Sequence, residues 1–378
     1  MSTVPSSLNI LLKGQLEFLS HEFEIIGVSS HGDDLTETQL REGIKVIPIN
    51  MERGISPLKD LISLFKLYLL FKREKPQIIH SITPKAGLLS MLAGKLASVP
   101  IRMHTFTGLV FPTKNGIIKK ILIIMDRLLC WAATNVYPEG NGVKNDLIAY
   151  RITCKPLHVL ANGNVNGIDL VHYSKMGCES LNICGLKAEL GIDKGDFVFV
   201  FVGRLVGDKG VNELVSAFKS LNNAACKLLL VGSFEGHLDP LLENTVVEIA
   251  NNPNILSVGF QKDVRPYLTI SDVLILPSYR EGFPNVVLQA GAMQLPCIVT
   301  DINGSNEIIK NDVNGIIIPK EDSDSILKAM GKMMHDRNYY NFLRHNSRSM
   351  IESRYEQSLV WIALKDEYDR LLKGIEIK

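Results

Sequence analysis

Leu276-Pro-Ser-Tyr-Arg-Glu-Gly-Phe-Pro-Asn-Val-Val-Leu-Gln289 is the segment most informative about the fold, because its pattern passes from a strand through a loop into a helix. The apolar run Asp272–Leu276 predicts a buried parallel strand, and the strand ends at Pro277, which cannot donate a ladder hydrogen bond. Pro284 suits the first position of a helix, and a helical apolar pattern continues over Val286–Met293. This order predicts an open α/β sheet, in which ligands bind at the carboxyl ends of the strands.

The loop and the helix start that follow this strand offer a site for an anion. A helix N-terminus presents unpaired N–H groups and a positive dipole end. We therefore expect a diphosphate on the backbone of the helix start, and we expect Glu281 to reach a hydroxyl-bearing or developing cationic part of the same ligand. The predicted phosphate seat consists of Gly282, Phe283, Pro284, Asn285 and Val286.

A second strand and loop carry cations. Phe197–Val202 predicts a strongly buried strand, which leads into Gly203, Arg204, Lys209 and a helix from Val211 onward. Arginine can bind a diphosphate in a bidentate manner, and lysine adds a point charge. The two cations therefore suit the stabilisation of a departing diphosphate.

The rest of the chain repeats a βαβα order, which indicates parallel sheets, and its 378 residues favour two domains. The start is unusual, because a helical pattern over residues 8–19 begins where a buried first strand is expected. We interpret this strand as missing or truncated, and we expect a sheet edge in its place. Further strands are predicted at 23–29, 45–49, 77–80, 101–108, 134–137, 227–231, 255–258 and 297–300, and further helices at 37–42, 58–71, 88–97, 186–190, 323–334, 339–353 and 359–372.

The net charge of +1 hides a basic region, since residues 53–127 contain 13 basic and 3 acidic residues. Residues 59–75 and 117–131 form amphipathic patterns within it. Such helices lie on anionic lipid, or they are ordinary helices with solvated lysines. The six cysteines lack metal-ligand spacing and indicate free thiols in a reducing compartment. A signal peptide and a membrane-spanning run are not predicted, so we expect a cytoplasmic protein that contacts the inner face of the membrane.

The segment Tyr279–Ala290 resembles the signature of the large retaining, nucleotide-sugar-dependent glycosyltransferase group of the family 4 type, and residues 80–87 resemble its capsule and O-antigen members. The resemblance implies an α/β GT-B fold with two Rossmann-like domains facing a central cleft. It places the acceptor domain at residues 1–165 and the donor domain at 166–358, with a hinge near Asn166. It also implies that a C-terminal helix in 359–378 crosses back to the first domain.

The same resemblance implies roles for individual residues. Glu281 corresponds to a glutamate that contacts the donor sugar, and Gln289 stands where the family usually has a second glutamate that holds the ribose. Arg204 and Lys209 correspond to the residues that bind the donor diphosphate. Other donor-binding positions are Gly203, Gly232, Phe260 and Gln261, with the last two in a turn that faces the nucleobase. His104, Thr83 and Lys85 are expected on the acceptor side, with His104 facing the donor sugar at an open strand end. On its residue type alone, His104 instead suggests a structural hydrogen-bonding group.

Together these features predict a retaining hexosyl- or N-acetylhexosaminyltransferase that needs no cofactor and no metal. The resemblance implies a UDP-sugar donor and a lipid-diphosphate-linked saccharide acceptor in bacterial surface-polysaccharide synthesis, and no nucleic-acid partner is expected. Two alternatives stay open. One is a sugar-nucleotide 2-epimerase of the same fold, which would need no second substrate. The other is a non-catalytic nucleotide-binding subunit, suggested by Gln289 and by the unusual start.

Overall fold

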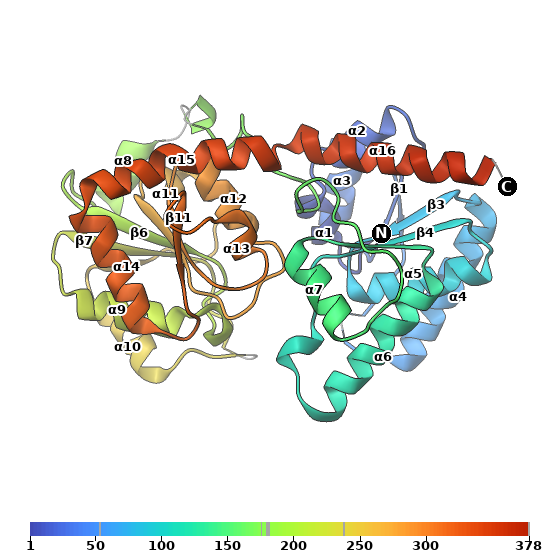
Figure 1. Cartoon of the computed structure of the whole chain (residues 1–378), viewed down its shortest axis with the longest axis horizontal. Coiled ribbons are helices and arrows are strands. Elements are labelled where there is room, and N and C mark those ends of the chain that lie inside the picture. The colour runs from blue at the N-terminus through green and yellow to red at the C-terminus, as the bar shows by residue number, and fades with distance from the viewer. Residues whose placement is uncertain (53, 175, 179–181, 237–238, 377–378) are drawn as a thin grey trace. The chain divides into compact units, whose positions relative to one another are not determined.

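The computed structural model describes residues 1–52, 54–174, 176–178, 182–236 and 239–376. The chain forms two compact units, and both contain parallel sheets, as the α/β prediction requires (Figure 1). Unit 1 comprises Met1–Gly167 and Gln357–Lys378, and unit 2 comprises Ile168–Glu356. The last two residues of the predicted 359–378 segment lie outside the described part of the chain.

Unit 2 contains a parallel sheet with the strand order β11-β10-β9-β6-β7-β8 among its described residues. Its two central strands carry apolar side chains on both faces, because helices cover both faces of a doubly wound sheet. The helix α9 packs against α14, and α12 packs against α15. The strands are β6 (Phe197–Val202), β7 (Cys226–Val231), β8 (Ile255–Ser257), β9 (Val273–Leu276), β10 (Cys297–Thr300) and β11 (Gly315–Ile318). The helices are α8 (Ile183–Glu189), α9 (Val211–Leu221), α10 (Glu243–Asn251), α11 (Arg265–Thr269), α12 (Asn285–Ala292), α13 (Ser305–Ile308), α14 (Ser323–His335) and α15 (Arg337–Tyr355).

Unit 1 contains two parallel sheets in its described residues, β1-β2 and β3-β4-β5. The first residues of the chain lie between them: Ser2 N donates to Val28 O (3.0 Å), and Ile82 N donates to Met1 O (3.1 Å). The strands are β1 (Ile26–Ser29), β2 (Lys45–Pro48), β3 (Ile78–Ser81), β4 (Ile101–Phe106) and β5 (Asn135–Pro138). The helices are α1 (Pro5–Leu11), α2 (Gln15–Ser20), α3 (Asp33–Glu42), α4 (Pro57–Glu74), α5 (Pro84–Leu96), α6 (Gly116–Ala132), α7 (Asn141–Ala149) and α16 (Gln357–Glu376).

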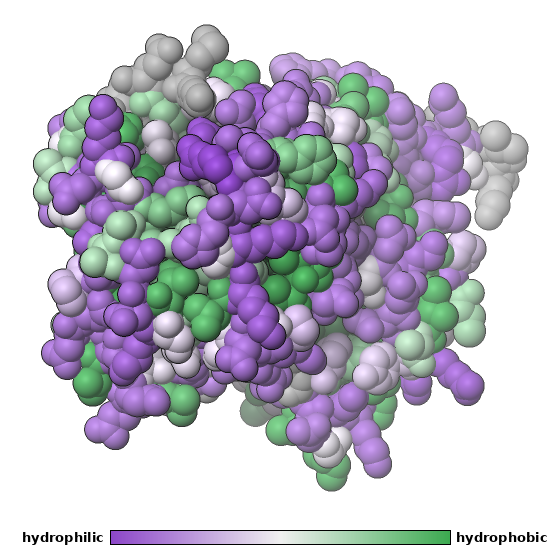
Figure 2. All heavy atoms as spheres, turned by 60° about the vertical axis from the view of Figure 1, so that its left-hand side comes forward, coloured by the Kyte–Doolittle hydropathy of each residue, from purple (hydrophilic) through white to green (hydrophobic). Residues whose placement is uncertain are grey.

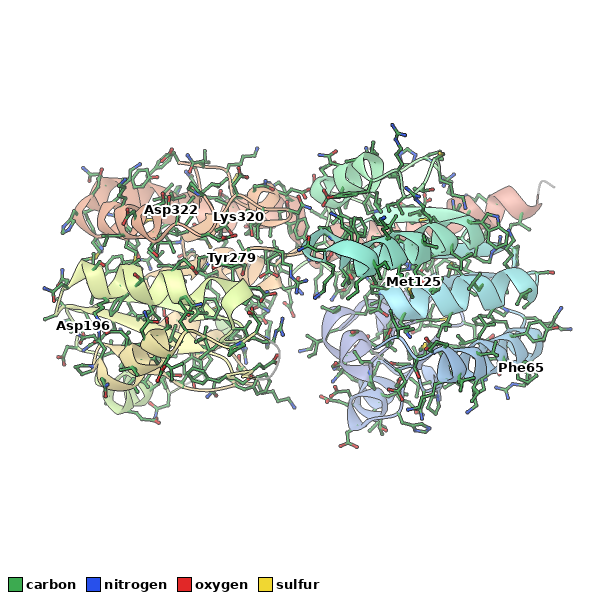
Figure 3. All side chains as sticks on the ribbon, turned by 90° about the horizontal axis from the view of Figure 1, so that it is seen from below. Phe65, Met125, Asp196, Tyr279, Lys320 and Asp322 are labelled. Carbon is green, nitrogen blue, oxygen red and sulfur yellow. The ribbon has the colours of Figure 1, made fainter. Side chains whose placement is uncertain are left out.

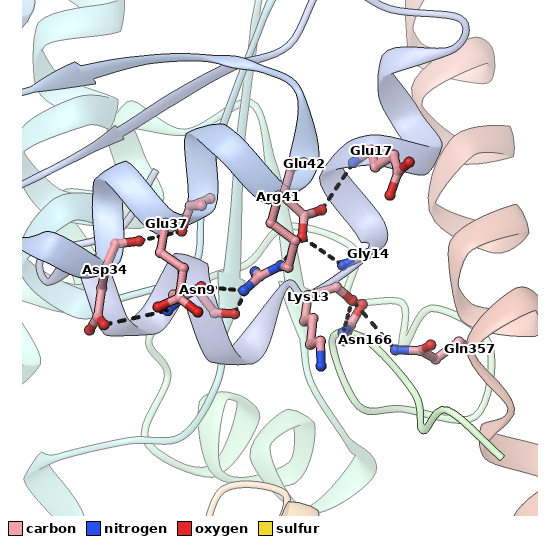
Figure 4. A network of polar contacts seen from close by, with 11 residues as sticks. Asn9, Lys13, Gly14, Glu17, Asp34, Glu37, Arg41, Glu42, Asn166 and Gln357 are labelled. Carbon is pink, nitrogen blue, oxygen red and sulfur yellow. Dashed lines mark hydrogen bonds and ion pairs between the residues drawn. The ribbon is translucent and has the colours of Figure 1, made fainter. Parts of the chain in front are cut away.

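The single helix predicted over residues 8–19 is wrong, because the chain turns at Gly14 and forms two short helices, α1 and α2. The buried carboxylate of Glu42 accepts hydrogen bonds from Gly14 N (2.9 Å) and Glu17 N (3.1 Å) at the start of α2 (Figure 4). A carboxylate at this position pairs with the positive end of the helix dipole. Glu42 therefore stabilises the second helix as a separate element.

The C-terminal helix α16 packs on unit 1, as the resemblance implied (Figure 1). The indole Nε1 of Trp361 donates to Asn166 Oδ1 (2.7 Å), and Tyr368 OH lies 2.7 Å from His80 Nδ1. Asn166 Nδ2 also donates to Lys13 O (3.0 Å), so this residue joins α16 to the turn between α1 and α2 (Figure 4). These bonds tie the last helix to the first 166 residues of the chain.

Candidate active site

Two loops of unit 2 meet at the carboxyl ends of β6 and β9, which are neighbouring parallel strands. The loop after β6 includes the short 3-10 helix Gly207–Lys209, and the loop after β9 begins at Pro277. Tyr279 N donates to Asp208 O (2.8 Å). Gly210 has a φ of +68°, and a Cβ atom at this position would lie only 2.1 Å from Pro277 O. The two loops are therefore in direct backbone contact, and only glycine fits at residue 210.

The predicted residues Lys209 and Glu281 are brought together by these loops. Lys209 Nζ lies 2.6 Å from Glu281 Oε1, and the two side chains are only 17% and 16% exposed. An ammonium and a carboxylate thus stand side by side at the edge of the sheet where α/β proteins bind ligands. The roles predicted for the two residues, Lys209 on the donor diphosphate and Glu281 on the donor sugar, stay predictions.

Two further ion pairs involve residues of these loops. Arg204 Nη1 lies 2.9 Å from Glu235 Oε2, with side chains 45% and 37% exposed. Arg280 Nη2 lies 2.9 Å from Asp208 Oδ2 and so adds a second link between the two loops. Because exposed ion pairs contribute only about 0–1 kcal/mol, Arg204 can exchange its carboxylate for an anionic ligand at little cost.

The backbone of the predicted phosphate seat is restrained by contacts on two sides. The prediction that Pro284 is the first helical residue is wrong. Pro284 directly precedes α12, because its ψ of 104° is extended. The ring of Phe283 is buried against Tyr355, with ring centroids 5.5 Å apart. On the other side, a Cβ atom on Gly304 would lie 2.2 Å from Gly282 O. Asn285 and Val286 form the first turn of α12, and Val286 packs against the core.

Gln289 lies in α12, one turn beyond the helix start, and its side chain is half-buried. Its Nε2 donates to the hydroxyl of Tyr173 (2.9 Å). Burial raises the pKa of Tyr173 to about 12, so the phenol stays neutral at physiological pH.

The remaining predicted donor residues lie at the ends of the neighbouring strands. Gly203 N donates to Val231 O (2.9 Å), and Gly232 N donates to Gly259 O (2.9 Å). Gln261 Nε2 donates to Val258 O (2.8 Å), which closes the turn after β8, and the ring of Phe260 is exposed. The contact of this turn with a nucleobase stays a prediction.

His104 lies in unit 1, and its position differs from the prediction. The side chain is 0% exposed and lies inside β4, not at an open strand end. Its Nδ1 lies 2.8 Å from Ser81 Oγ, while Nε2 has no hydrogen-bond partner among the described residues. The ring fits because Gly87 has no side chain: a Cβ atom there would lie 2.5 Å from the ring's Cε1. Burial lowers the pKa of His104 to about 3, so the imidazole is neutral.

The two other predicted acceptor residues already have partners within unit 1. Thr83 Oγ1 accepts a hydrogen bond from Thr3 N (2.8 Å). The ammonium of Lys85 is buried and contacts Asp60 Oδ2 (2.5 Å) and Gly54 O (2.7 Å). These contacts fix the start of α5, and an acceptor-binding role for either residue stays a prediction.

Four residues that contact the predicted site were not among its predicted members: Tyr173, Asp208, Arg280 and Gly304. Asp208 and Arg280 lie in the two loops from which site residues were predicted. Their opposite charges could have indicated an ion pair between these loops. Tyr173 and Gly304 contact the site from distant parts of the sequence, and nothing local indicates this.

The two units with their parallel sheets have the GT-B fold, which solved structures share. The chain resembles HepE of Anabaena in complex with UDP, with a TM-score of 0.81 at 16% identity over 98% of both chains. It also resembles WaaG, a glycosyltransferase involved in lipopolysaccharide biosynthesis, with a TM-score of 0.71 at 12% identity over 96% of this chain and 95% of the other. These likenesses confirm the predicted fold.

The sequence comparisons identify the family. Residues 185–350 match the family "Glycosyl transferases group 1", and residues 7–138 match "Glycosyl transferase 4-like". The capsular polysaccharide biosynthesis glycosyltransferase CapM of Staphylococcus aureus is 32% identical over 97% of this chain and 96% of its own length. A UDP-Gal:alpha-D-GlcNAc-diphosphoundecaprenol alpha-1,3-galactosyltransferase of Escherichia coli is 30% identical over 89% of this chain and 87% of its own length. The chain belongs to the group 1 glycosyltransferase family and is a glycosyltransferase.

Within the described ranges, the His, Cys, Asp and Glu side chains form no group of three or more that could hold a metal ion. The helices in the same ranges are all too short or too polar to span a bilayer.

Proposed function

We propose that this glycosyltransferase moves a sugar from a UDP-sugar to a hydroxyl group of a lipid-diphosphate-linked saccharide, with retention of configuration at the sugar's anomeric carbon. The observation that carries the proposal is the Lys209–Glu281 contact of 2.6 Å at the sheet edge, with Arg204 on the same loop as Lys209. The donor and acceptor classes follow those of the E. coli relative, a UDP-Gal-dependent galactosyltransferase, and the capsule relative supports a role in surface-polysaccharide synthesis.

In the proposed reaction the donor diphosphate replaces the carboxylates that now face Lys209 and Arg204. The oxygen of the acceptor hydroxyl bonds to the anomeric carbon as the bond from that carbon to the diphosphate breaks, and the acceptor's proton passes to the departing phosphate on the same face. The two cations and the backbone N–H groups at the start of α12 stabilise the developing charge. Glu281, released from Lys209, then lies beside the donor sugar. Cationic side chains here supply the charge that Mg²⁺ supplies in many phosphate sites, so no metal is required.

A lipid-linked acceptor lies in a membrane, so the proposed enzyme needs a surface that binds lipid. Unit 1 has a candidate for this surface. The helices α4, α5 and α6 lie side by side (Figures 1 and 3). Lys66, Lys72 and Lys120 are exposed on α4 and α6, and Lys95 Nζ lies 3.5 Å from the ring centroid of Trp131. Exposed apolar side chains occur among them at helical spacing: Leu58, Leu61, Phe65 and Leu69 on α4, and Ile117, Ile121, Ile124, Leu128 and Trp131 on α6. The face drawn in Figure 2, by contrast, is mostly hydrophilic. Apolar side chains with flanking lysines suit docking on anionic lipid.

The activity is tested by incubating the enzyme with UDP-sugars, with and without a polyprenyl-diphosphate-linked saccharide, in the presence of EDTA. We expect transfer only when the acceptor is present, and NMR should show the donor's anomeric configuration in the product. Conversion of the donor to an epimer without acceptor would support the 2-epimerase alternative. Inversion, or a loss of transfer in EDTA that Mg²⁺ restores, would contradict the mechanism.

The membrane contact is tested by sedimentation with vesicles. We expect binding to anionic vesicles at low salt, little binding to neutral vesicles, and release as salt is raised. Lys66→Glu with Lys120→Glu should abolish binding. Lys219→Glu with Lys328→Glu, the matched change at exposed lysines of unit 2, should preserve it. Equal binding by the two variants would contradict docking through α4 and α6.

A further inference from the structure

Unit 2 contains a cavity of about 240 Å³ at the end of its sheet that is opposite to the candidate active site. The cavity lies beside Asp272, which directly precedes β9, whereas Glu281 follows the carboxyl end of the same strand. The four residues of β9 separate these two ends by about 13 Å. Met293 and Gln294, which follow the end of α12, also line the cavity. The cavity is therefore separate from the site described above.

The positive charge of the cavity comes from one face of α15. Tyr340, Arg344 and Arg348 line the cavity at intervals of four residues, which places them on one side of the helix. The guanidinium of Arg348 donates to backbone carbonyl oxygens, whereas that of Arg344 makes no hydrogen bond and no ion pair among the described residues. The lining contains one carboxyl group, that of Asp272, which accepts a hydrogen bond from Val198 N (2.9 Å). Two guanidinium groups and one carboxylate leave one positive charge in excess.

Two hydroxyl groups of the lining can accept hydrogen bonds from a ligand. Ser271 Oγ donates to Tyr267 O (2.7 Å), and Thr269 Oγ1 donates to Arg265 O (2.7 Å). A hydroxyl group has one proton and two lone pairs, so both oxygens can still accept a hydrogen bond. A ligand that pairs with them must carry hydroxyl groups of its own.

Gln294 brings an amide to the cavity from a strained backbone position. Gln294 N donates to Gly291 O (3.0 Å), and Leu295 N donates to Ala290 O (2.9 Å). These two bonds form a Schellman motif at the end of α12, and the motif favours glycine at residue 294. Because Gln294 has a φ of +65°, its side chain is present at an energetic cost. The side-chain amide has no hydrogen-bond partner in the described part of the chain. A strained residue with an unpaired polar group is typical of a binding site.

We propose that this cavity binds a small hydroxylated anion, namely a monosaccharide that carries a phosphate or a carboxylate group. Arg344 binds the oxyanion, and Gln294 donates to an oxygen of the sugar. Ser271, Thr269 and Asp272 accept from the sugar's hydroxyl groups. The volume of about 240 Å³ lies below the roughly 300 Å³ at which sites for drug-sized ligands begin, so it suits a monosaccharide better than a nucleotide.

The ligand class is tested by calorimetry with glucose 6-phosphate, glucuronate, glucose and inorganic phosphate. We expect glucose 6-phosphate or glucuronate to bind more tightly than glucose and inorganic phosphate, because only the first two combine an oxyanion with hydroxyl groups. Tighter binding of glucose 6-phosphate identifies phosphate as the oxyanion, and tighter binding of glucuronate identifies carboxylate. Saturating UDP should leave the affinity unchanged, because the cavity is separate from the proposed donor site.

Two variants test the residues. Arg344→Gln should weaken binding by about 10- to 100-fold, because it removes a charge-assisted hydrogen bond. Lys328→Gln, which removes an exposed charge from α14 of the same unit, should leave binding unchanged. Gln294→Gly should weaken binding by about two- to tenfold, while the melting temperature stays at or above that of the wild type, because glycine suits the Schellman motif. A purely structural role for Gln294 would instead lower the melting temperature.

The inference is wrong if the wild type binds neither glucose 6-phosphate nor glucuronate, or binds glucose or inorganic phosphate as tightly. Wild-type affinity in Arg344→Gln or in Gln294→Gly also overturns it. Displacement of the sugar anion by UDP would overturn it too, because the anion would then occupy the proposed donor site. Failure of the wild type to bind UDP contradicts the proposed donor site alone, and the two variants still decide the inference.

Discussion

Gly210→Ala should disrupt the contact between the two site loops far more than its backbone conformation alone predicts. Gly210 has a φ of +68°, and its Cβ atom would lie 2.1 Å from Pro277 O and 2.8 Å from the carbonyl carbon. Gly191 provides the matched control in the same unit, because its φ is +62° and no heavy atom beyond its chain neighbours lies within 4 Å of its Cβ position among the described residues. Both substitutions strain the backbone equally, but only one creates an overlap.

The two substitutions should lower the free energy of unfolding by different amounts. A left-handed alanine costs about 1–2 kcal/mol, which is the whole effect expected for Gly191→Ala. A Cβ atom normally lies more than about 3 Å from a carbonyl oxygen, so Gly210→Ala must also move one loop by about 1 Å. Overpacking of this kind costs about 1–3 kcal/mol, which gives roughly 2–5 kcal/mol in total. A displacement of 1 Å at the Lys209–Glu281 contact should also reduce turnover by about 100-fold.

Both variants are compared by urea denaturation followed by circular dichroism, together with steady-state kinetics. Tryptophan fluorescence would miss the effect, since Trp131 and Trp361, the two tryptophans of the chain, both belong to unit 1. Because two units need not unfold in one transition, the unit 2 midpoints are the quantity to compare. Equal shifts and equal turnover for Gly210→Ala and Gly191→Ala would refute the loop contact on which the site depends.

Three further predictions concern single side chains. Glu281→Gln should lower kcat by orders of magnitude while nucleotide still binds, and a near-normal kcat would remove Glu281 from the active site. Lys209→Met should reduce kcat by about 100- to 1,000-fold, as the loss of one preorganised donor to a developing charge does, whereas Lys219→Met, which breaks the more exposed pair with Glu248, should leave kcat unchanged. Burial raises the pKa of Asp126 to about 7, so the carboxyl binds its proton more tightly in the folded protein. The stability of the wild type relative to Asp126→Asn should therefore fall between about pH 4 and pH 7 and then level off, and a constant difference in urea midpoint across that range would contradict the shift.

The order of strands, loops and helices around the site was predictable, because local patterns determine it. Buried apolar runs bounded by glycine and proline mark β6 and β9. Parallel strands then place the loops that follow them at one edge of the sheet, and this rule brings Lys209 to Glu281. The fold class followed from the same repeat of elements. In contrast, β11 was not predicted, because Gly315–Ile318 is a short apolar run, and so short a run is as compatible with a loop as with a strand.

Positions that depend on packing between distant segments were not predictable. His104 has the residue type of a catalytic group, but its burial depends on Gly87 in the preceding helix α5, which leaves space for the ring. Likewise, the partner of Gln289 lies 116 residues away in sequence. Sequence patterns assign residues to strands and helices, whereas such contacts follow from how those elements pack.

The ion pairs of unit 2 should affect the binding of the proposed donor and the release of the nucleoside diphosphate product. Lys209, Arg204 and Arg280 each face a carboxylate, namely Glu281, Glu235 and Asp208. A diphosphate that binds here exchanges existing ion pairs for new ones, so its net electrostatic gain is smaller than the charge of the cations suggests. The same carboxylates can return to Lys209 and Arg204 once the sugar has been transferred, and they then compete with the nucleoside diphosphate product. In the proposed site, pairing in the free enzyme should therefore weaken ground-state binding of the diphosphate and favour product release, while both cations stay close enough to stabilise the charge that develops during transfer.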